Sequence, residues 1–437
     1  MPVRWARRRP AWPAWPCLAG AAAKCVLARV RACVLACALA CALALVLACA
    51  AAGGAAAQQP ARPDSVPRRD TVTARADSVA RRLDSLAAAA LDTSPAAPLR
   101  PTSVGPLFIP AIFYAPETGI GGGAGVLYLR TTDPLNAAQR LSTHAANALV
   151  TAKGQYVLSV LNDVWTKGNG WRVGFDVSWA RFPNRFYGIG SQRVDSGETF
   201  TPTSFSGLVS AQRLFGPGVY AGPKLTFDDT RISDVVPGGI LAGGASGAGG
   251  WRLVTLSWLT SWDRRDQLYW PTHGFLLSTS VGRAFGHLGS TQTFNRVTLD
   301  ARGYTRLQGD HLLAAQFWTD FTDGAAPFDR LPQLGGQQLL RGYFAGQFRD
   351  RHSAVAQLEY RSPGFDWSWE KRLSMVVFVA TGGTAREPSR FVIEELHTAG
   401  GAGLRFALTP GDRLNFRLDY GVGRSSSAVY ITLGESF

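Results

Sequence analysis

From about residue 105 onward, hydrophobic and polar residues alternate in short runs that Gly, Pro, Asn and Asp interrupt. In the run 171–179, one face carries Trp171, Val173, Phe175, Val177 and Trp179, and the other carries Arg172, Asp176 and Ser178. A period of two over roughly ten residues is typical of a transmembrane strand with one face toward lipid and the other toward a lumen. Beyond residue 57 no apolar stretch of about 18 residues occurs, so the sequence excludes helical spans there.

The alternating pattern contains sixteen candidate strands. They lie at 106–114, 118–130, 140–152, 154–165, 171–182, 200–214, 217–230, 248–263, 274–286, 292–307, 311–322, 351–362, 371–381, 398–408, 412–422 and 427–437. An even number of antiparallel strands can close without free edges, as a membrane requires. The sequence therefore predicts an all-β fold, a 16-stranded antiparallel transmembrane β-barrel over 105–437. A soluble β-sandwich is the alternative, but it leaves the Trp- and Phe-rich second face unexplained.

Two further predictions concern aromatic residues near the strand ends and a charged residue in the last strand. Five aromatic residues near strand ends are expected to form girdles at the membrane interfaces: Tyr128, Trp165, Trp262, Trp270 and Tyr430. In the last strand, Glu435 is in phase with the apolar face, which is tolerable near an interface.

The chain ahead of the strands divides into two segments. Residues 1–57 combine a basic start, the apolar run 32–52 and an Ala55-Ala56-Ala57 site, which together predict a secretory signal peptide. A retained anchor and a lipoprotein site at Cys49 are the alternatives. Residues 58–104 are rich in Ala, Pro, Ser, Asp and Arg and predict a linker. Its apolar residues, spaced by six and seven, favour a short helix at 69–91, although a solvated tether is the simpler interpretation.

The charge and cysteine content of the chain narrow the possible classes of function. Basic residues exceed acidic ones by 14, which alone suggests nucleic-acid binding. However, seven of the 45 basic residues, none of the 31 acidic ones and all six cysteines lie in the first 57 residues. The remaining chain has half of the excess charge and no cysteine, so disulfides, thiol catalysis and Cys-ligated zinc are excluded there. No nucleic-acid partner is expected.

Motifs for catalysis are missing from the sequence. The six histidines are scattered without metal-ligand spacing, and neither a Gly-x-Ser-x-Gly elbow nor a phosphate-binding loop occurs. We therefore expect no catalytic residue, no metal and no cofactor, and an enzyme is the weakest of the function classes.

Three stretches of the sequence are more specific than the alternation expected of any transmembrane barrel. The first reads Leu-Gly-Gly-Gln-Gln-Leu-Leu-Arg-Gly-Tyr over 334–343, between the candidate strands 311–322 and 351–362. The second is Asp-Arg-Arg-Asp at 263–266 with Pro-Thr-His-Gly at 271–274, and the third is the last strand, with Gly434 close to Phe437. Together they resemble the barrel domain of the outer-membrane protein assembly factor superfamily, the BamA/TamA-like or bacterial surface antigen family.

The resemblance implies that the first stretch folds into the lumen, with Arg341, Gly342 and Tyr343 at its tip. An Arg in a narrow lumen needs a carboxylate. In the family this partner maps to Glu359, which the alternation also places inward. The family's second Asp is absent here, because that position is Ala380, and Asp419 is the candidate substitute. The ion pair between Arg341 and Glu359 either only stabilises the folded barrel or takes part in the function of the protein.

The other two stretches predict a turn and a seam. Asp263, Arg264, Asp266 and Gly274 are expected to form a charge cluster that stabilises a turn. The seam residues are Pro110, Gly434 and Phe437. Proline cannot donate to a strand ladder and glycine weakens a strand, so the first and last strands should pair weakly. In the family this seam opens laterally to template substrate strands. The alternative is that Pro110 only limits pairing at the edge of the first strand.

The resemblance thus implies a protein of the bacterial outer membrane that acts in outer-membrane protein assembly or translocation. Its expected partners are outer-membrane lipid, other outer-membrane proteins as substrates, and assembly machinery that contacts the C-terminal strand. Family members carry periplasmic domains ahead of the barrel, where this sequence has only the linker 58–104, so insertase activity does not follow directly. A passive pore or structural barrel is the alternative.

Overall fold

The structure is a computed structural model that describes residues 103–136, 139–190, 192–267, 270–368, 371–391, 395–408 and 415–437. The predicted signal peptide at 1–57, the helix at 69–91 and all but the last two residues of the linker at 58–104 lie outside the described residues.

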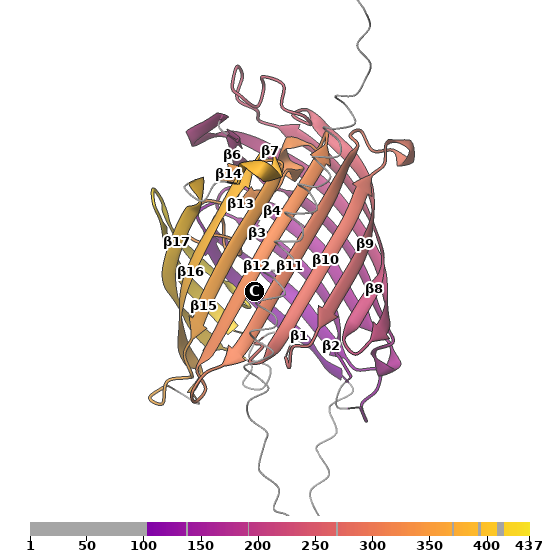
Figure 1. The fold of residues 1–437 in the computed structure, drawn as a ribbon, viewed down its shortest axis with the longest axis vertical. Coiled ribbons are helices and arrows are strands. Elements are labelled where there is room, and N and C mark those ends of the chain that lie inside the picture. The colour runs from indigo at the N-terminus through magenta and orange to yellow at the C-terminus, as the bar shows by residue number, and fades with distance from the viewer. Residues whose placement is uncertain are drawn as a thin grey trace, which may run out of the picture.

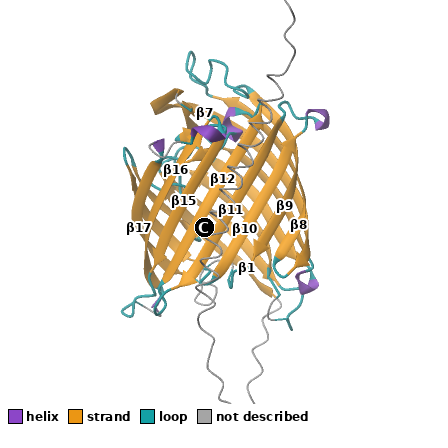
Figure 2. Ribbon diagram, in the orientation of Figure 1, coloured by secondary structure: helices purple, strands orange, loops and turns teal. Residues whose placement is uncertain are grey.

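Sixteen antiparallel strands form one closed barrel (Figures 1 and 2), which confirms the predicted fold class. The strands are β1 (Ser103–Ala115), β2 (Gly119–Arg130), β3 (Ser142–Thr151), β4 (Tyr156–Trp165), β5 (Trp171–Arg181), β7 (Gln192–Gly216), β8 (Val219–Ser233), β9 (Gly250–Asp263), β10 (Gly274–Ala284), β11 (Phe294–Arg306), β12 (Leu312–Gly324), β15 (His352–Arg361), β16 (Leu373–Ala385), β17 (His397–Ala407), β18 (Asn415–Gly423) and β19 (Ser427–Leu433). Each pairs with its neighbours in this order, and β1 meets β19 to close the barrel.

The remaining elements lie in the connections. β6 (Asn184–Ile189) forms a hairpin with the start of the long strand β7, and β13 (Gln333–Leu334) pairs with β14 (Phe348–Arg349). The described residues also contain short 3-10 helices: η1 (Lys167–Asn169), η2 (Gly286–Leu288), η3 (Phe328–Arg330) and η5 (Pro388–Arg390). β6, β13 and β14 lie at one end of the barrel, opposite the end where β1 begins (Figure 1).

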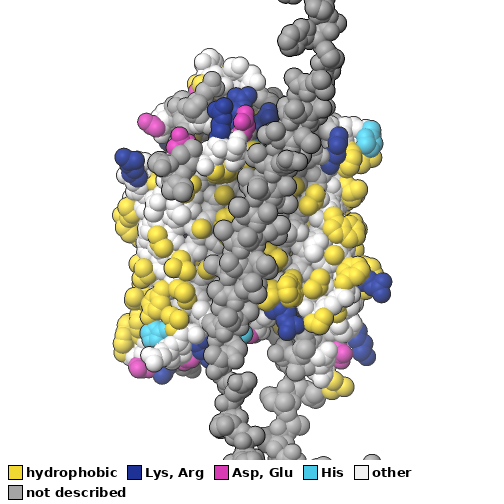
Figure 3. Space-filling model, viewed as in Figure 1, with side chains coloured by type: hydrophobic (Ala, Val, Ile, Leu, Met, Phe, Trp, Pro, Cys, Tyr) yellow, Lys and Arg dark blue, Asp and Glu magenta, His cyan; other side chains and the backbone are white. Residues whose placement is uncertain are grey.

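The outer wall of the barrel is apolar. Outward residues along the strands include Phe175, Trp179, Trp258, Val377 and Tyr420, each more than two-fifths exposed. Figure 3 shows hydrophobic side chains over the visible wall and many of the visible charged side chains toward the two ends. An apolar outer face and a polar inner face are what a strand between lipid and a lumen requires.

No helix in the described part of the chain is long and apolar enough to cross a membrane.

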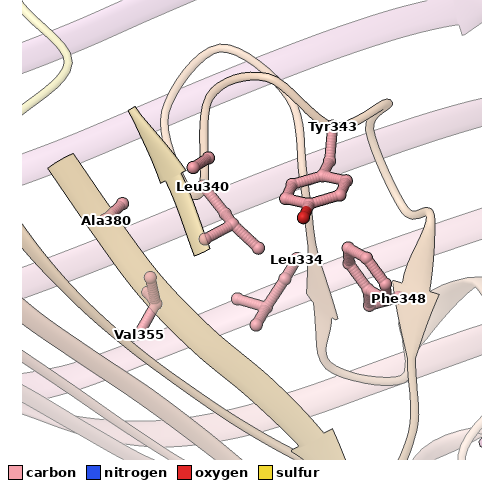
Figure 4. Packing of buried hydrophobic residues seen from close by; sticks show 7 residues of the cluster. Leu334, Leu340, Tyr343, Phe348, Val355 and Ala380 are labelled. Atoms are coloured by element: carbon pink, nitrogen blue, oxygen red, sulfur yellow. The ribbon is translucent and has the colours of Figure 1, made fainter. Parts of the chain in front are cut away.

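The connection between β12 and β15, residues 325–351, folds into the lumen, and we call it the lumen loop. Its residues Leu334, Leu340, Tyr343 and Phe348 are buried together against the barrel wall (Figure 4). The wall contributes Val355 of β15, Ala380 of β16 and Ala399 of β17. The loop therefore occupies the side of the lumen that β15, β16 and β17 form.

A second buried cluster lies at the end of the barrel that carries β6. Phe186 and Phe200 of the β6–β7 hairpin pack edge-on against Phe328 of the lumen loop, with ring centroids 5.2 and 5.1 Å apart. Leu241, from the connection between β8 and β9, completes the cluster. We call this cluster the cap.

The structure differs from the sequence predictions at the end of the last strand and in the aromatic girdles. β19 ends at Leu433 rather than at 437, because Gly434 adopts a φ of +78° and turns the chain inward. Glu435 therefore lies in the lumen rather than at the lipid face. Of the five predicted girdle residues, Trp165, Trp270 and Tyr430 are buried, so only Tyr128 and Trp262 remain candidates for an interface.

Candidate functional site

Arg341 of the lumen loop is held by two carboxylates. Its Nη2 is 2.5 Å from Oε2 of Glu359 on β15, and its Nη1 is 2.6 Å from Oδ2 of Asp419 on β18. All three side chains are fully buried. The guanidinium carbon also lies 3.6 Å from the ring centroid of Phe378 on β16, a cation–π contact. Three strands thus converge on one side chain.

The wall around Arg341 is built from glycines because the loop backbone approaches closely. A Cβ on Gly421 would lie 2.8 Å from the backbone carbon and oxygen of Arg341, and a Cβ on Gly423 would lie 2.4 Å from the ring of Tyr343. On the loop side, Gly342 has a φ of +118° and lies against Val422. Any larger residue at these positions would push the loop away from β18.

The tip of the loop is also tied to the last hairpin of the barrel. The hydroxyl of Tyr430 on β19 donates to the carbonyl oxygen of Tyr343 at 3.0 Å, and the hydroxyl of Ser426 donates to the carbonyl oxygen of Gly342 at 2.6 Å. The hydroxyl of Tyr343 accepts from the backbone N–H of Arg424 at 2.9 Å. The loop tip is therefore bonded to β18, β19 and the turn between them.

Glu117, in the turn between β1 and β2, holds the other side of the same loop. Its Oε1 accepts from the backbone N–H of Ala345 at 2.5 Å. Burial raises the pKa of Glu117, although the hydrogen bond to Ala345 and the charge of Lys153 act in the opposite direction. The lumen loop thus contacts both strands that border the closure of the barrel, β19 through Tyr430 and β1 through the turn that follows it.

The closure between β1 and β19 is short. In the described residues its register contains one pair, Tyr114 with Ile431. Every other pair of neighbouring barrel strands is matched over seven residues or more. Pro110 lies in β1 opposite Ala124 of β2. The outward residues Phe108 and Ile112 of β1 are 77% and 70% exposed, more than outward residues in the middle of the sheet. We call the β1–β19 junction the seam.

The predicted turn cluster divides into two parts. Asp266 accepts from the backbone N–H groups of Thr272 and His273 at 2.9 and 3.2 Å, and Gly274 follows with a φ of +96°. Arg264 contributes a backbone N–H to the carbonyl of Phe275. Asp263 instead lies nearly buried beside the lumen, where it pairs with Arg265 at 2.9 Å and with Arg140 at 2.7 Å. This Arg140 contact comes from a distant part of the chain, between β2 and β3.

A match to known proteins decides the family. The model of the Omp85 superfamily domain matches residues 140–437. The chain belongs to the Omp85 superfamily. Membership places it among outer-membrane protein assembly and translocation barrels of bacteria.

Two solved structures are similar to this Omp85 barrel. BamA from Haemophilus ducreyi, in a crystal structure that lacks POTRA domains 1–3, aligns with a TM-score of 0.53 at 12% identity, over 77% of this chain and 70% of that one. CdiB from Acinetobacter baumannii aligns with a TM-score of 0.49 at 9% identity, over 76% of this chain and 60% of that one. The BamA likeness supports the fold of this chain. No match to the sequence was found among curated proteins.

The Omp85 barrel brings some of the sequence-predicted residues together and separates others. Arg341, Gly342, Tyr343, Glu359 and Asp419 meet in the lumen. Of the residues assigned to the seam, Pro110 lies in β1 and Gly434 directly follows β19. Phe437 lies in the lumen, packed against Tyr304 and Leu312, because the turn at Gly434 redirects the chain. Its predicted place at the seam is therefore corrected.

Sequence reasoning missed several members of the site. Arg361, Arg405, Arg417 and Glu435 are buried or nearly buried beside Arg341, and Phe378 forms its aromatic support. The two-residue alternation could have found Arg361, which shares a face with Glu359, and likewise Arg417, which shares a face with Asp419. The alternation placed Glu435 on the lipid face, so it gave no sign of the lumenal contacts of this residue. Among the described residues, no group of three or more His, Cys, Asp and Glu is arranged to hold a metal ion.

Proposed function

We propose that this Omp85 barrel assembles or translocates outer-membrane proteins by opening laterally at the seam. The observation that carries the proposal is the closure by one residue pair, Tyr114 with Ile431, where other neighbouring strands are matched over seven or more. A strand edge with unpaired N–H and C=O groups can pair with a strand of another chain. The proline in β1 lowers the number of donors available to close the seam.

The lumen loop is proposed to control this opening rather than to carry out catalysis. It bonds to β19 through Tyr430 and approaches β1 through Glu117. A loop held on both sides of a weak junction stabilises the closed form and must move when the junction widens. No catalytic residue, metal or cofactor is invoked for this role.

The proposed partners follow from the surfaces involved. The apolar outer wall contacts outer-membrane lipid. Substrates are other outer-membrane proteins, whose strands would pair with the exposed edge of β1. Assembly machinery would contact the last strand, β19, when this barrel is itself inserted.

Depletion of the protein tests the proposal. If the protein assembles other barrels, its depletion lowers the amounts of folded outer-membrane proteins while their synthesis continues. The proposal fails if these amounts stay unchanged and only the permeability of the membrane to solutes is altered.

One observation favours a passive pore as the second candidate. A cavity of about 390 Å³ lies in the lumen beside β4, β5, β7 and β9, and its polar lining includes Asp163, Asp176, Arg172, Lys224 and Gln212. A hydrated path on this side of the barrel would conduct ions past the lumen loop. Planar-bilayer recordings with the purified barrel test this: steady conductance supports a pore, whereas a closed baseline supports the assembly role.

A further inference from the structure

The last four residues, 434–437, leave the barrel wall at Gly434 and turn into the lumen, and we call them the tail. The backbone N–H of Gly434 still donates to the carbonyl oxygen of Asn415 on β18 at 2.8 Å, so the tail starts from a fixed point. Phe437 then packs with Trp270, Tyr304, Leu312 and Ala314. These residues belong to β11, β12 and the connection before β10, none of which neighbours β19. The tail therefore ties the last strand to β11 and β12.

Two chains of charged contacts join the tail to Arg341. In the first, Glu359 holds Arg341 with Oε2 and holds Nε of Arg361 with Oε1 at 2.8 Å. Arg361 in turn donates from Nη2 to the backbone oxygen of Phe437 at 3.0 Å. The hydroxyl of Ser436 also lies 3.4 Å from Oε2 of Glu359. One carboxylate thus connects the loop and the tail.

The second chain runs through Asp419 and Arg405. Asp419 holds Arg341 with Oδ2 and holds Nη1 of Arg405 with Oδ1 at 2.5 Å. Arg405 then bonds through Nε to Oε2 of Glu435 at 2.7 Å, and Nδ2 of Asn415 donates to Oε1 of Glu435 at 2.9 Å. The two chains meet at Arg341 in the loop and at the tail, so the contacts form a closed ring.

The charge balance makes the ring sensitive to the tail. Four arginines, at 341, 361, 405 and 417, share three side-chain carboxylates, at 359, 419 and 435, and all seven side chains are buried or nearly so. Withdrawal of Glu435 leaves these four buried arginines with two side-chain carboxylates. A buried charge without a partner is strongly unfavourable, so the seating of Arg341 becomes weaker. By reciprocity, release of Arg341 must weaken the seating of the tail.

We propose that the tail is a clasp that couples the lumen loop to the last barrel strand, with Glu435 as its positioning residue. While the loop is seated, the clasp fixes the end of β19, and while the tail is docked, the ring retains Arg341. The coupling stands on the contacts of the ring alone. Its consequence for opening at the seam rests on the proposed function.

Amide hydrogen exchange of the full-length barrel in lipid vesicles tests the coupling. Two variants undock the tail by different means. Glu435→Gln removes the carboxylate from Arg405. In Gly434→Ala the added Cβ would lie more than 4 Å from every other atom considered, so it causes no clash. Alanine nevertheless disfavours the φ of +78° that turns the tail inward. This conformational penalty corresponds to roughly a tenfold shift of the docking equilibrium toward the undocked tail. We expect both to speed exchange over 334–350 by about the same factor as over β19. Faster exchange at the tail with an unchanged loop would overturn the proposal.

Two further variants complete the design. Arg341→Ala should speed exchange in β19 and the tail, and an unchanged β19 would contradict the reciprocal coupling. Glu387→Gln is the control, since it removes an exposed ion pair with Arg390 and should alter neither segment. If Glu435→Gln prevents folding, Gly434→Ala still decides the question because it leaves every charge of the ring in place. These measurements need no substrate, so they can fail while the depletion experiment succeeds, and the reverse.

Discussion

At the scale of single residues, the chemistry of the site is the neutralisation of Arg341 inside the barrel. A buried guanidinium is tolerated only where carboxylates and hydrogen bonds replace the lost water. Glu359 could be predicted because its position in the alternation faces inward, and Asp419 could be named as the second carboxylate. Phe378 and Arg405 could not be predicted, since their contacts with the ring depend on which strands curve around the loop.

Glu359→Gln should destabilise the folded barrel, because it leaves Arg341 and Arg361 short of a carboxylate while both remain buried. Removal of one partner of a buried pair costs about 3–5 kcal/mol. The measurement is the temperature at which the folded band is lost on a gel without prior boiling. Asp366→Asn is the matched control, because its ion pair with Lys371 is exposed. Equal heat resistance of the two variants would contradict the buried lock.

At the scale of elements, the sixteen strands could be predicted from the alternation alone, because the outer face of the barrel strands is mainly apolar. The position at which the last strand ends could not be predicted from the alternation. The period of two continues through Glu435, but the left-handed turn at Gly434 takes the chain off the wall. The pattern also gave no sign of the glycines that face the loop, because a close approach between β18 and the loop joins residues that are far apart in sequence.

Gly421→Ala should displace the lumen loop, because the new Cβ would lie 2.8 Å from backbone atoms of Arg341 that have no freedom to rotate away. Such overpacking costs about 1–3 kcal/mol. Limited proteolysis should show faster cleavage within 334–350. Gly207→Ala in β7 is the control, since its Cβ meets nothing within 4 Å. Similar protection of the loop in both variants would argue against close packing on β18.

The contact between the β1–β2 turn and the loop should depend on pH. Burial raises the pKa of Glu117 above 4.5, so the folded protein binds this proton more tightly than the unfolded chain. The folded state therefore gains stability as the pH falls from the raised pKa toward 4.5, and loses that gain as the pH rises. Glu117→Gln keeps an acceptor for the N–H of Ala345 and removes the charge.

Unfolding of the wild type and of Glu117→Gln at neutral and mildly acidic pH checks this expectation. The variant should be the more stable of the two at neutral pH, and the difference should shrink on acidification. A difference that stays constant, or that grows toward acid pH, would show that Glu117 does not titrate as a buried carboxyl in the folded protein.

At the scale of the whole molecule, the barrel is closed unevenly. The cap lies at one end of the barrel and the lumen loop lies along one side. A cavity remains beside β4 and β9, and among the described residues the register of the seam contains a single pair. The sequence could predict a weak seam from Pro110 and Gly434. It could not predict that the loop contacts both sides of the seam, because the residues that do so come from a turn near residue 117 and a strand near residue 430.

A disulfide across the seam tests the central claim most directly. Tyr114 and Ile431 are opposite each other in the register, and all six native cysteines lie at or before residue 49. Antiparallel partners lie about 4.5–5.5 Å apart at Cα, within the range that a disulfide spans. The control pair, Leu418→Cys with Ile431→Cys, locks β18 to β19 and leaves the seam free.

The readout is the amount of folded outer-membrane proteins in cells that depend on each variant, measured before and after addition of a reductant. If the barrel works by lateral opening, Tyr114→Cys with Ile431→Cys lowers these amounts when oxidised and restores them when reduced, whereas the control pair has no effect. Normal amounts with the seam fully crosslinked would contradict the account.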